Sequence, residues 1–456
     1  MDGKFSEWKK IESGVPQGSV LGPLLFLVFI NDLIDNLTCK VFIFADDTSL
    51  LDIVETPEQT VIRLNENLLV VQEWGVKWKV DFNPSKTEAL VLSKKLRKVN
   101  HPQLQLMGKN VKRIQEHKYL GLIISHNFSR TSHIRSVCNK AAIQLSKLRK
   151  CMYILPLTAL ECIYFTSVRS VLEYASPVID NCTQQCCAML EAVQYRAALC
   201  VTGAMKTSSK TKVLKCLGWP SLAVRRKYFK LVLYFKMING LCPLHFRRSL
   251  LPAQNNEVHN YMLRNATARQ IPRARTNVFA GSFVPSTTKL WNSLPPNIQD
   301  SNSINSFKAN IKKLLFPARL DHLRYGPRKL NMTLNRLRVD FSALNAHLFT
   351  RQLIDTQACL CGFPSETTYH FLLQCPLFVI PRQDFLARIS QILQTAQPLL
   401  IFDNLSNCEK THICLYGHKD FSFDANCNIL DATMKYIQVT KRFSKDLSET
   451  TEEGDQ

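Results

Sequence analysis

The N-terminal part of the chain mixes apolar runs with short polar turns, which predicts helices and strands within one small region. An apolar run at 24–30 follows Pro23, and Pro is favoured at the first positions of a helix. We therefore expect a buried helix of about 12 to 14 residues within 20–38. The apolar runs 40–44 and 49–51 flank an acidic turn, which predicts a β-hairpin with two carboxylates at its tip.

Longer periodic segments follow this hairpin. Apolar residues at helical spacing predict a helix over 57–79, and strands are expected at 87–93 and 117–125. From about 132 to 240 the pattern is helical, and 303–316 predicts one more helix.

The composition of the C-terminal half of the chain changes from one segment to the next. Residues 252–285 are polar and irregular and are expected to form a linker, and a small module is expected over about 320–380. Residues 445–456 contain five acids and one Lys, which is typical of a disordered tail.

Overall composition limits the class of protein. The chain has 456 residues, of which 46% are hydrophobic and 21% charged, so collagen-like, low-complexity and fully disordered proteins are excluded. The longest apolar run, 20–30, is interrupted by Gly22 and Pro23 and is too short to span a bilayer. The first residues lack an apolar signal core, so we expect neither membrane insertion nor secretion.

The positive charge is concentrated in the middle of the chain. The formal net charge is +22, and residues 77–248 contain 30 Lys and Arg against 7 Asp and Glu, or +23. The rest of the chain is therefore close to neutral. A basic segment of this kind favours nucleic acid as the partner over the alternative of a merely soluble basic surface.

Asp46 and Asp47 are adjacent at the expected hairpin tip. Neighbouring carboxylates repel each other unless a cation intervenes, and Mg²⁺ prefers a few carboxylates together with phosphate oxygens. Two such ions can hold the attacking and leaving oxygens of a phosphoryl transfer. The alternative, which the isolated dipeptide favours, is an exposed turn that uses Asp for its backbone preference.

One group of Cys and His residues has the spacing of metal ligands. Cys359, Cys361, His370 and Cys375 form the pattern Cys-x-Cys-x8-His-x4-Cys, which suits tetrahedral structural Zn²⁺. The Cys-x-Cys gap is unusually tight, and residues i and i+5 lie only loosely on one helix face, so three core Cys and a surface His are the alternative. Other cysteines are expected to be small core residues, among them Cys138, Cys151, Cys162, Cys200 and Cys216.

Four short motifs follow one another within about 110 residues. They are Gly-Val-Pro-Gln-Gly at 14–18, Phe-Ala-Asp-Asp at 44–47, Asn-Pro-Ser-Lys at 83–86 and Tyr-Leu-Gly at 119–121. Together they resemble the palm of reverse transcriptases of LINE-type (non-LTR) retrotransposons, in the Jockey and I-like groups. The resemblance covers about 8–128 and extends more loosely to about 380, where 366–376 resembles the Cys/His segment of the same family.

The resemblance implies a role for each matching position. Asp46 and Asp47 would bind two catalytic Mg²⁺ ions, and Lys86 would approach the phosphates of a deoxynucleoside triphosphate. The positions that would lie near template, nucleotide or primer end are Gln17, Gly18, Phe44 and Ala45. The positions that would form the primer grip are Tyr119, Leu120 and Gly121. The basic helices would be the thumb, which holds an RNA template and a DNA primer or target through phosphate contacts.

The implied organisation is an α+β protein with a partial palm of antiparallel strands and helices, a helical thumb and a small zinc module. The expected divisions are 1–128 (palm), 129–250 (thumb), 251–318 (linker and short helix), 319–380 (Cys/His module) and 381–456 (a region without recognisable motifs, with an acidic tail). The segment 291–296, followed by Phe307, also resembles a recurrent piece of these polyproteins and is expected to be a packing element.

The family also uses a further metal-binding Asp on a strand well before the Gly-Val-Pro-Gln-Gly loop, where only Asp2 is found here. We therefore expect this chain to be the C-terminal part of a larger polyprotein, located in the nucleus or cytoplasm, and inactive as a polymerase alone. The rival interpretation is a non-enzymatic nucleic-acid-binding protein built on the thumb and zinc module. A third is a fragment that does not fold stably.

Overall fold

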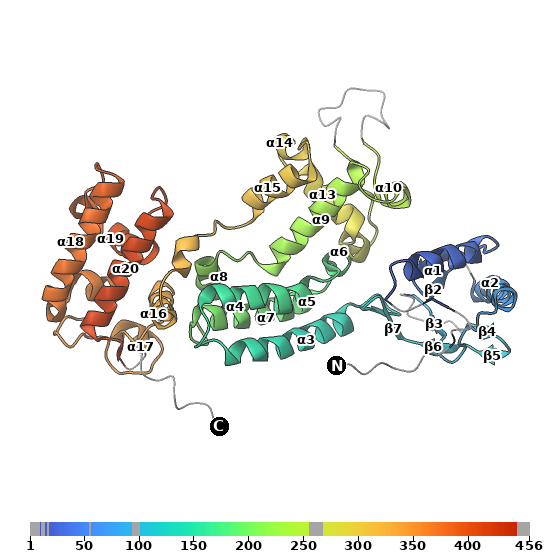
Figure 1. The fold of residues 1–456 in the computed structure, drawn as a ribbon, viewed down its shortest axis with the longest axis horizontal. Coiled ribbons are helices and arrows are strands. Elements are labelled where there is room, and N and C mark those ends of the chain that lie inside the picture. Colours follow the sequence, from blue (N-terminus) through green and yellow to red (C-terminus); the bar gives the residue numbers. More distant parts are fainter. Residues whose placement is uncertain are drawn as a thin grey trace. The chain divides into compact units, whose positions relative to one another are not determined.

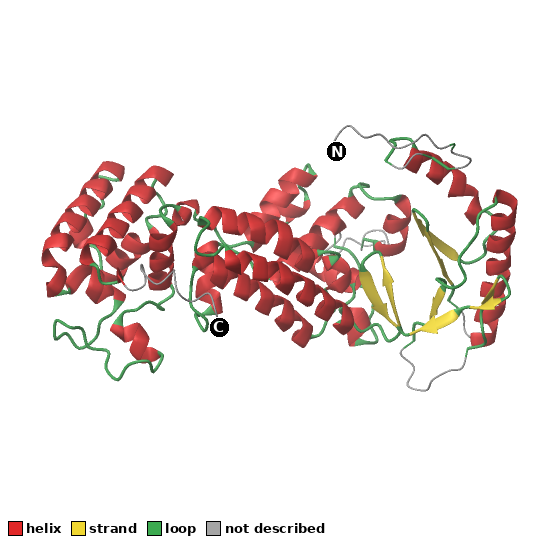
Figure 2. Cartoon of the chain, turned by 60° about the horizontal axis from the view of Figure 1, so that its bottom comes forward, coloured by secondary structure: helices red, strands yellow, loops and turns green. Residues whose placement is uncertain are grey.

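The computed structural model describes residues 10, 14–15, 18–53, 56–93, 101–254 and 268–444. They belong to two compact units, 1–129 and 130–456. The first unit carries the strands, and the second is helical (Figures 1 and 2). The mixture of helices and small sheets agrees with the expected α+β class.

The first unit begins with the elements that the sequence predicts. In order, these are α1 (Gly22–Ile30), the 3₁₀ helix η1 (Asn31–Ile34), β1 (Lys40–Phe44), β2 (Asp47–Leu51) and α2 (Pro57–Trp78). Six short strands follow: β3 (Glu88–Leu90), β4 (Gln105–Leu106), β5 (Lys109–Asn110), β6 (Lys112–Ile114), β7 (Glu116–Tyr119) and β8 (Leu122–Ser125). Helix α2 starts where expected because Thr56 accepts a hydrogen bond from the Gln59 amide and Pro57 fills the first position.

The strands of this unit pair only two by two among the described residues. The pairs β1–β2, β4–β5 and β7–β8 are antiparallel, whereas β3–β6 is parallel. The expected antiparallel sheet is thus present only as separate pairs, one of them with the opposite orientation. The single strand expected at 117–125 is wrong, because Leu120 (φ 45°) and Gly121 (φ 81°) form a two-residue turn that folds it into a hairpin.

Helix α1 is less buried than its sequence predicts. Ile30 joins Leu33, Val71 and Trp74 in a small core, and Asp32 ties this end to α2 by accepting from the indole nitrogens of Trp74 (2.7 Å) and Trp78 (3.1 Å). The exposed apolar side chains of α1 and β1 include Leu24, Leu25, Leu27, Val28, Phe42 and Phe44. Helix α1 is short and apolar on all sides, but only one of its faces packs against neighbouring elements. Its other faces are therefore exposed to solvent.

The second unit opens with the expected basic helices. They are α3 (Thr131–Lys150), α4 (Leu157–Ile163), the π-helix η2 (Tyr164–Arg169), α5 (Ser170–Glu173), α6 (Ser176–Ile179), α7 (Gln184–Thr202), α8 (Lys210–Leu217), α9 (Leu222–Ile238) and α10 (Leu244–Leu250). The middle of the unit contains α12 (Asn277–Ala280), α13 (Phe283–Asn292), α14 (Pro296–Gln299) and α15 (Ile304–Leu315). No helix in the described part of the chain is long and apolar enough to cross a membrane.

The middle helices pack on α9 through an aromatic core. Phe307 is fully buried and stacks on Phe235 with ring centroids 4.3 Å apart, and Trp291 lies in the same cluster. The expected packing role of Trp291 and Phe307 is therefore confirmed. The described part of the expected linker is also folded, because it contains α12 and the start of α13, and Asn181 Nδ2 donates to the Val278 carbonyl at 2.7 Å.

The last helices of the unit share one core. They are η3 (Asp321–Arg324), α16 (Arg328–Arg338), α17 (Asn345–Thr350), the π-helix η4 (His370–Gln374), η5 (Pro376–Phe378), α18 (Val379–Ala396), η6 (Phe402–Asn404), α19 (Asn407–Tyr416) and α20 (Phe423–Thr440). The core runs from Leu323 to Phe443, so residues on both sides of 380 contribute to it. The acidic tail lies outside the described residues.

The cysteines of the second unit follow the expectation only in part. Cys138, Cys200 and Cys216 are buried, Cys151 is half-buried, and Cys162 is exposed. The prediction for Cys162 is wrong because this side chain lies on the outer face of α4, beside the buried Leu160 and Glu161.

Candidate active site and Cys/His cluster

The two aspartates lie at the tip of the β1–β2 hairpin, as the sequence predicts. Phe44 pairs with Asp47, and Ala45 and Asp46 form the turn, with Ala45 in the left-handed region (φ 51°). Both carboxylates are exposed. Among the described residues they have no third acidic or His/Cys side chain grouped with them as a possible metal ligand. The tip therefore offers two carboxylates to a cation but is not a complete metal site within this part of the chain.

Lys86 lies in a turn that is built by Asn83. The side-chain Oδ1 of Asn83 accepts from the amides of Ser85 (3.0 Å) and Lys86 (3.3 Å), and Lys86 itself is exposed. The next strand, β3, is joined to β7 by a side-chain hydrogen bond between Glu88 Oε2 and His117 Nδ1 at 3.0 Å. This contact brings the strand after Lys86 next to the strand that ends at Tyr119.

The remaining predicted positions in this unit are turn residues. Leu120 and Gly121 form the tip of the β7–β8 hairpin directly after Tyr119, in the positive-φ geometry of a tight turn. Gly18 has φ 83°, and a side chain added there would meet nothing within 4 Å. A glycine is therefore favoured at this position by the positive backbone angle rather than by close packing. Gln17 lies outside the described residues.

The Cys/His residues form a compact cluster. The ligand atoms of Cys359, Cys361, His370 and Cys375 all lie within 4.8 Å of one another. The Sγ atoms of Cys359 and Cys375 are 3.7 Å apart, and Cys361 Sγ is 3.3 Å from His370 Nε2. Tetrahedral Zn²⁺ with the usual bond lengths sets its ligand atoms about 3.6 to 3.8 Å apart. The residues therefore fit a tetrahedral metal ion.

Two local structures bring these four residues together. The chain turns tightly after Cys359, whose amide donates to the Phe363 carbonyl (2.9 Å) while Gly362 adopts φ 88°. The second structure is the π-helix η4, in which the Cys375 amide donates to the His370 carbonyl at 2.8 Å. A π-turn brings residue i+5 back beneath residue i, so it aligns two residues that an α-helix would hold on different faces.

A buried ion pair braces this cluster. The carboxylate of Glu366 accepts from Arg442 Nε (2.7 Å), from Arg442 Nη2 (2.6 Å) and from the Asn345 amide (2.8 Å). Asn345 Nδ2 donates to the Ala358 carbonyl (2.6 Å), directly before the first Cys. Arg382 Nη1 donates to the Cys375 carbonyl (2.6 Å). Both ends of the cluster are thus fixed by side chains from α17, from α18 and from Arg442, which follows α20.

Burial changes the protonation of the cluster. It raises the pKa of the Cys375 thiol to about 12 and raises the pKa of Cys359, while it lowers the pKa of His370. His370 is therefore neutral at neutral pH, the form that binds metals. The Cys thiols would release their protons when a metal binds.

Part of the predicted basic charge is exposed and part is internal. On α3 the side chains of Arg135, Lys140, Lys147 and Lys150 are exposed. By contrast, Arg226 and Lys230 of α9 are buried and both pair with Asp180, at 3.0 and 2.7 Å. The positive charge of the sequence therefore overstates the surface that is open to a polyanion.

Comparison with known proteins extends this picture. Residues 1–124 match the family described as reverse transcriptase (RNA-dependent DNA polymerase). The chain is 31% identical over 155 residues to the "RNA-directed DNA polymerase from mobile element jockey" of Drosophila funebris, covering 32% of this chain and 17% of that protein. It is 24% identical over 381 residues to the "Putative 115 kDa protein in type-1 retrotransposable element R1DM" of Drosophila melanogaster, covering 81% of this chain and 34% of that protein. No solved structure matches the chain.

Residues 1–124 thus match a reverse transcriptase domain, and this is the part of the chain that contains the four motifs. The chain is similar to the reverse transcriptases of Jockey-type non-LTR retrotransposons, which confirms the resemblance that the four motifs predicted. The chain spans between a sixth and a third of the length of the two relatives described above. The similarity to the R1DM protein covers 81% of this chain, so it extends through much of the helical unit.

Proposed function

We propose that this chain contributes the Asp-Asp hairpin of an RNA-directed DNA polymerase, with Asp46 and Asp47 as ligands of the catalytic Mg²⁺ ions. The observation that supports this most strongly is the exposed carboxylate pair at a hairpin tip, within the residues that match the reverse transcriptase family. Mg²⁺ bound there would stabilise the charge that develops as a nucleotide is transferred. The substrates would be deoxynucleoside triphosphates on a primed RNA template.

The other matching residues would bind and orient substrates. Lys86, exposed after its turn, would approach the phosphates, and the hairpin tip 119–121 would hold the primer end. Phe44 and Ala45 border the carboxylates, and Gly18 leaves its surroundings open to a neighbouring base pair. Gln17 would complete the same loop.

A polymerase test addresses the carboxylates directly. Since the described residues bring no third carboxylate to this tip, we expect the chain alone to give no template-dependent primer extension with Mg²⁺. Mn²⁺ should still bind at the tip in the presence of a deoxynucleoside triphosphate, with an electron paramagnetic resonance signal that D46N loses. D35N, which changes another exposed Asp of the same unit, should retain that signal. Equal binding by D46N would remove the assigned role.

We also propose that the Cys/His cluster holds one structural Zn²⁺ ion. The compact set of four ligands and their bracing by Glu366 support this assignment. Metal analysis of the purified chain should give one zinc per molecule, and C375S should lose it. Cobalt substitution should give the absorption of a tetrahedral thiolate site. A metal-free protein with unchanged thermal unfolding after chelation would contradict the assignment.

A second candidate function is nucleic-acid binding without synthesis. The exposed Lys and Arg side chains of α3 favour it, because they form a solvent-accessible basic row on one helix. Duplex affinity should then fall with salt, and K140A/K147A should reduce the slope of log K against log salt by about 2. K419A, which removes an exposed charge before α20, is the control. This function would be unaffected by D46N.

A further inference from the structure

Two cysteines are in contact at the start of α7, away from the carboxylate pair and from the Cys/His cluster. Cys182 lies just before this helix and Cys187 lies within its first turns, and their Sγ atoms are 3.4 Å apart. Both side chains are half-buried, so a small solute can reach them. The neighbouring Cys186 is buried, and its Sγ lies 3.8 Å from Thr131 Oγ1. The two thiols therefore form an accessible pair that leaves Cys186 out.

The helix cap brings these two thiols together. The side chain of Thr183 caps α7 by accepting a hydrogen bond from the Cys186 amide at 3.3 Å. Cys182 therefore directly precedes the cap, and Cys187 occupies the fourth helical position. Side chains at these two positions of a capped helix often pack on each other, usually as an apolar pair. Here the same contact is made by two sulfur atoms.

Two cations that share one carboxylate lie beside the pair. Arg226 Nε and Lys230 Nζ both bind the carboxylate of Asp180, at 3.0 and 2.7 Å. The remaining end of the Arg226 guanidinium, Nη2, donates to Cys187 Sγ at 3.3 Å. A cation aimed at a sulfur stabilises the negative charge that the sulfur carries when it attacks or leaves. Burial raises the pKa of the Cys182 thiol, so we expect Cys187 to react first.

No third ligand joins these two thiols. In the ranges that the structure describes, the cluster of Cys359, Cys361, His370 and Cys375 is the one group of three or more possible metal ligands. Two thiols do not complete a tetrahedral metal site, whereas a disulfide needs only two sulfurs, about 2.05 Å apart once bonded. The contact therefore favours bond formation between the sulfurs over metal binding.

We propose that Cys182 and Cys187 form a reversible thiol–disulfide site that reacts with hydrogen peroxide. The Cys187 sulfur attacks one peroxide oxygen, the O–O bond breaks, and the other oxygen leaves as water with the thiol proton, which gives a sulfenic acid. The Cys182 sulfur then attacks the sulfenic sulfur, and the displaced hydroxide leaves as water with the Cys182 proton. The two thiols lose two electrons, and the peroxide is reduced to two molecules of water. The new bond ties the residue before α7 to its first turns.

Differential alkylation of the full chain, supplied with zinc, tests this site. Trypsin releases residues 170–196 as one peptide, because Arg169 and Arg196 border a stretch without Lys or Arg. In the untreated, denatured protein this peptide should carry three alkyl labels. After hydrogen peroxide it should carry only the label on Cys186. Reduction with dithiothreitol and a second alkylating reagent should then label Cys182 and Cys187.

The rate of oxidation separates a reactive pair from ordinary surface thiols. Cys408 is an exposed cysteine of the same unit and serves as the internal reference. The pair should lose its first labels at least about tenfold faster than Cys408, because Arg226 stabilises the reacting sulfur and the second thiol is already in contact. If Cys408 is oxidised as fast as the pair or faster, or if the disulfide formed contains Cys186, the assignment is wrong.

Single variants assign the two steps. C182S should stop at a sulfenic acid on Cys187, which dimedone labels, and C187S should form no disulfide in the peptide. C186S is the matched control and should form the disulfide at the wild-type rate. A disulfide that persists within the peptide of C187S would contradict the assignment. Because mapping of the wild-type chain already decides which sulfurs pair, a variant that fails to fold would leave that result standing.

Discussion

The two units of this chain use apolar and charged residues in opposite ways. In the first unit, Val28 and Phe44 are 69% and 60% exposed, while the core around Trp74 is small. In the second unit, the large side chains Phe307 and Phe371 are fully buried, and charged groups such as Lys230 and Arg338 are buried with them. The comparison teaches that similar apolar runs lead to burial only where enough neighbouring elements surround them.

The largest expected difference between the units concerns their aromatic residues. F307A should lower the free energy of unfolding of the second unit by about 3 to 5 kcal/mol, because it leaves a cavity in a close-packed core. F44A should change stability by no more than about 0.5 kcal/mol, because the ring is already in water. Chemical denaturation of both variants measures the two changes in the free energy of unfolding. Equal losses would contradict the expected difference between the two units.

Metal removal should act on the second unit alone. With free zinc at about 100 times its dissociation constant, the bound ion would stabilise this unit by about 2.7 kcal/mol. Chelation should therefore lower the unfolding transition of the helical unit and leave that of the first unit in place. Calorimetry of wild type and C375S, with and without chelator, tests this, since the variant should not respond.

Acid should also affect the second unit. Burial lowers the pKa of His133, His322 and His347 below the ordinary 6.5. The folded state then binds fewer protons than the unfolded state, so this stabilisation is complete above pH 6.5 and decreases as the pH falls below it. Unfolding followed between pH 7.5 and 5 should show the decrease.

The matched variant for this acid effect is H347N. The Nδ1 atom of His347 accepts from the Ser342 amide at 3.2 Å, and the Asn oxygen can take its place. H347N should make the pH dependence shallower without changing the fold. A slope that is unchanged in this variant would show that His347 does not contribute.

Removal of helix caps should have the smallest effects on stability. It should also reveal the finest difference between the two units. Thr56 caps α2 in the first unit, and Ser303 caps α15 in the second, each by accepting an amide hydrogen bond. T56A and S303A should each cost about 1 kcal/mol. Because the first unit has the smaller core, T56A should shift its thermal midpoint more than S303A shifts that of the second unit. The reverse order would contradict the expectation that the first unit, with the smaller core, unfolds with the smaller entropy change.

Local sequence patterns were sufficient to predict much of the fold and the Asp-Asp hairpin of the candidate site. The helix over 57–79, the hairpin at 40–51 and the helix at 303–316 were predicted because caps, turns and periodicity act within a few residues. The hairpin at 116–125 was missed, although Leu120-Gly121 carries a glycine at a turn position. The parallel pairing of β3 with β6 was missed because it joins segments that are distant in sequence.

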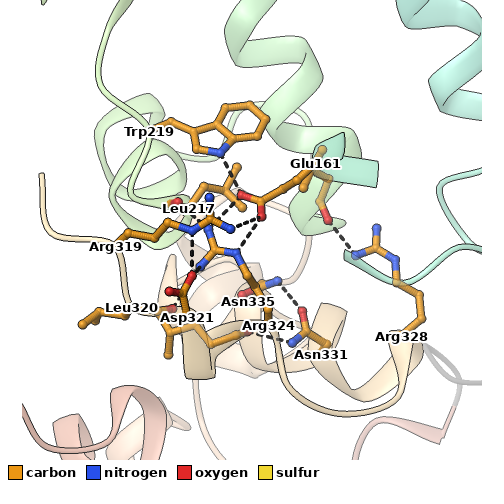
Figure 3. A network of polar contacts seen from close by, with 12 residues as sticks. Glu161, Leu217, Trp219, Arg319, Leu320, Asp321, Arg324, Arg328, Asn331 and Asn335 are labelled. Carbon is orange, nitrogen blue, oxygen red and sulfur yellow. Dashed lines mark hydrogen bonds and ion pairs between the residues drawn. The ribbon is translucent and has the colours of Figure 1, made fainter. Parts of the chain in front are cut away.

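The buried charges were beyond prediction from the sequence. The sequence analysis makes no assignment for Arg324, Arg328 or Arg338, which in the structure bind Glu161 (Figure 3) and the carbonyls of α7 and α19. The periodicity of the sequence does not indicate these contacts, because the partners are a carboxylate and backbone carbonyls up to 176 residues away. The π-helix that aligns His370 with Cys375 was also unforeseen, because a single i+5 step leaves no pattern.

The sequence by itself determined the resemblance to reverse transcriptases, the order of the motifs, the carboxylate pair at the hairpin tip and the four Cys/His residues, since each rests on short runs of particular side chains. Only the tertiary structure decided which charges are free and which are internal, and that the four Cys/His side chains meet within 4.8 Å. The physical reason is that burial depends on which segments pack together, and a buried Arg or Lys stays charged only where distant carboxylates and carbonyls receive it.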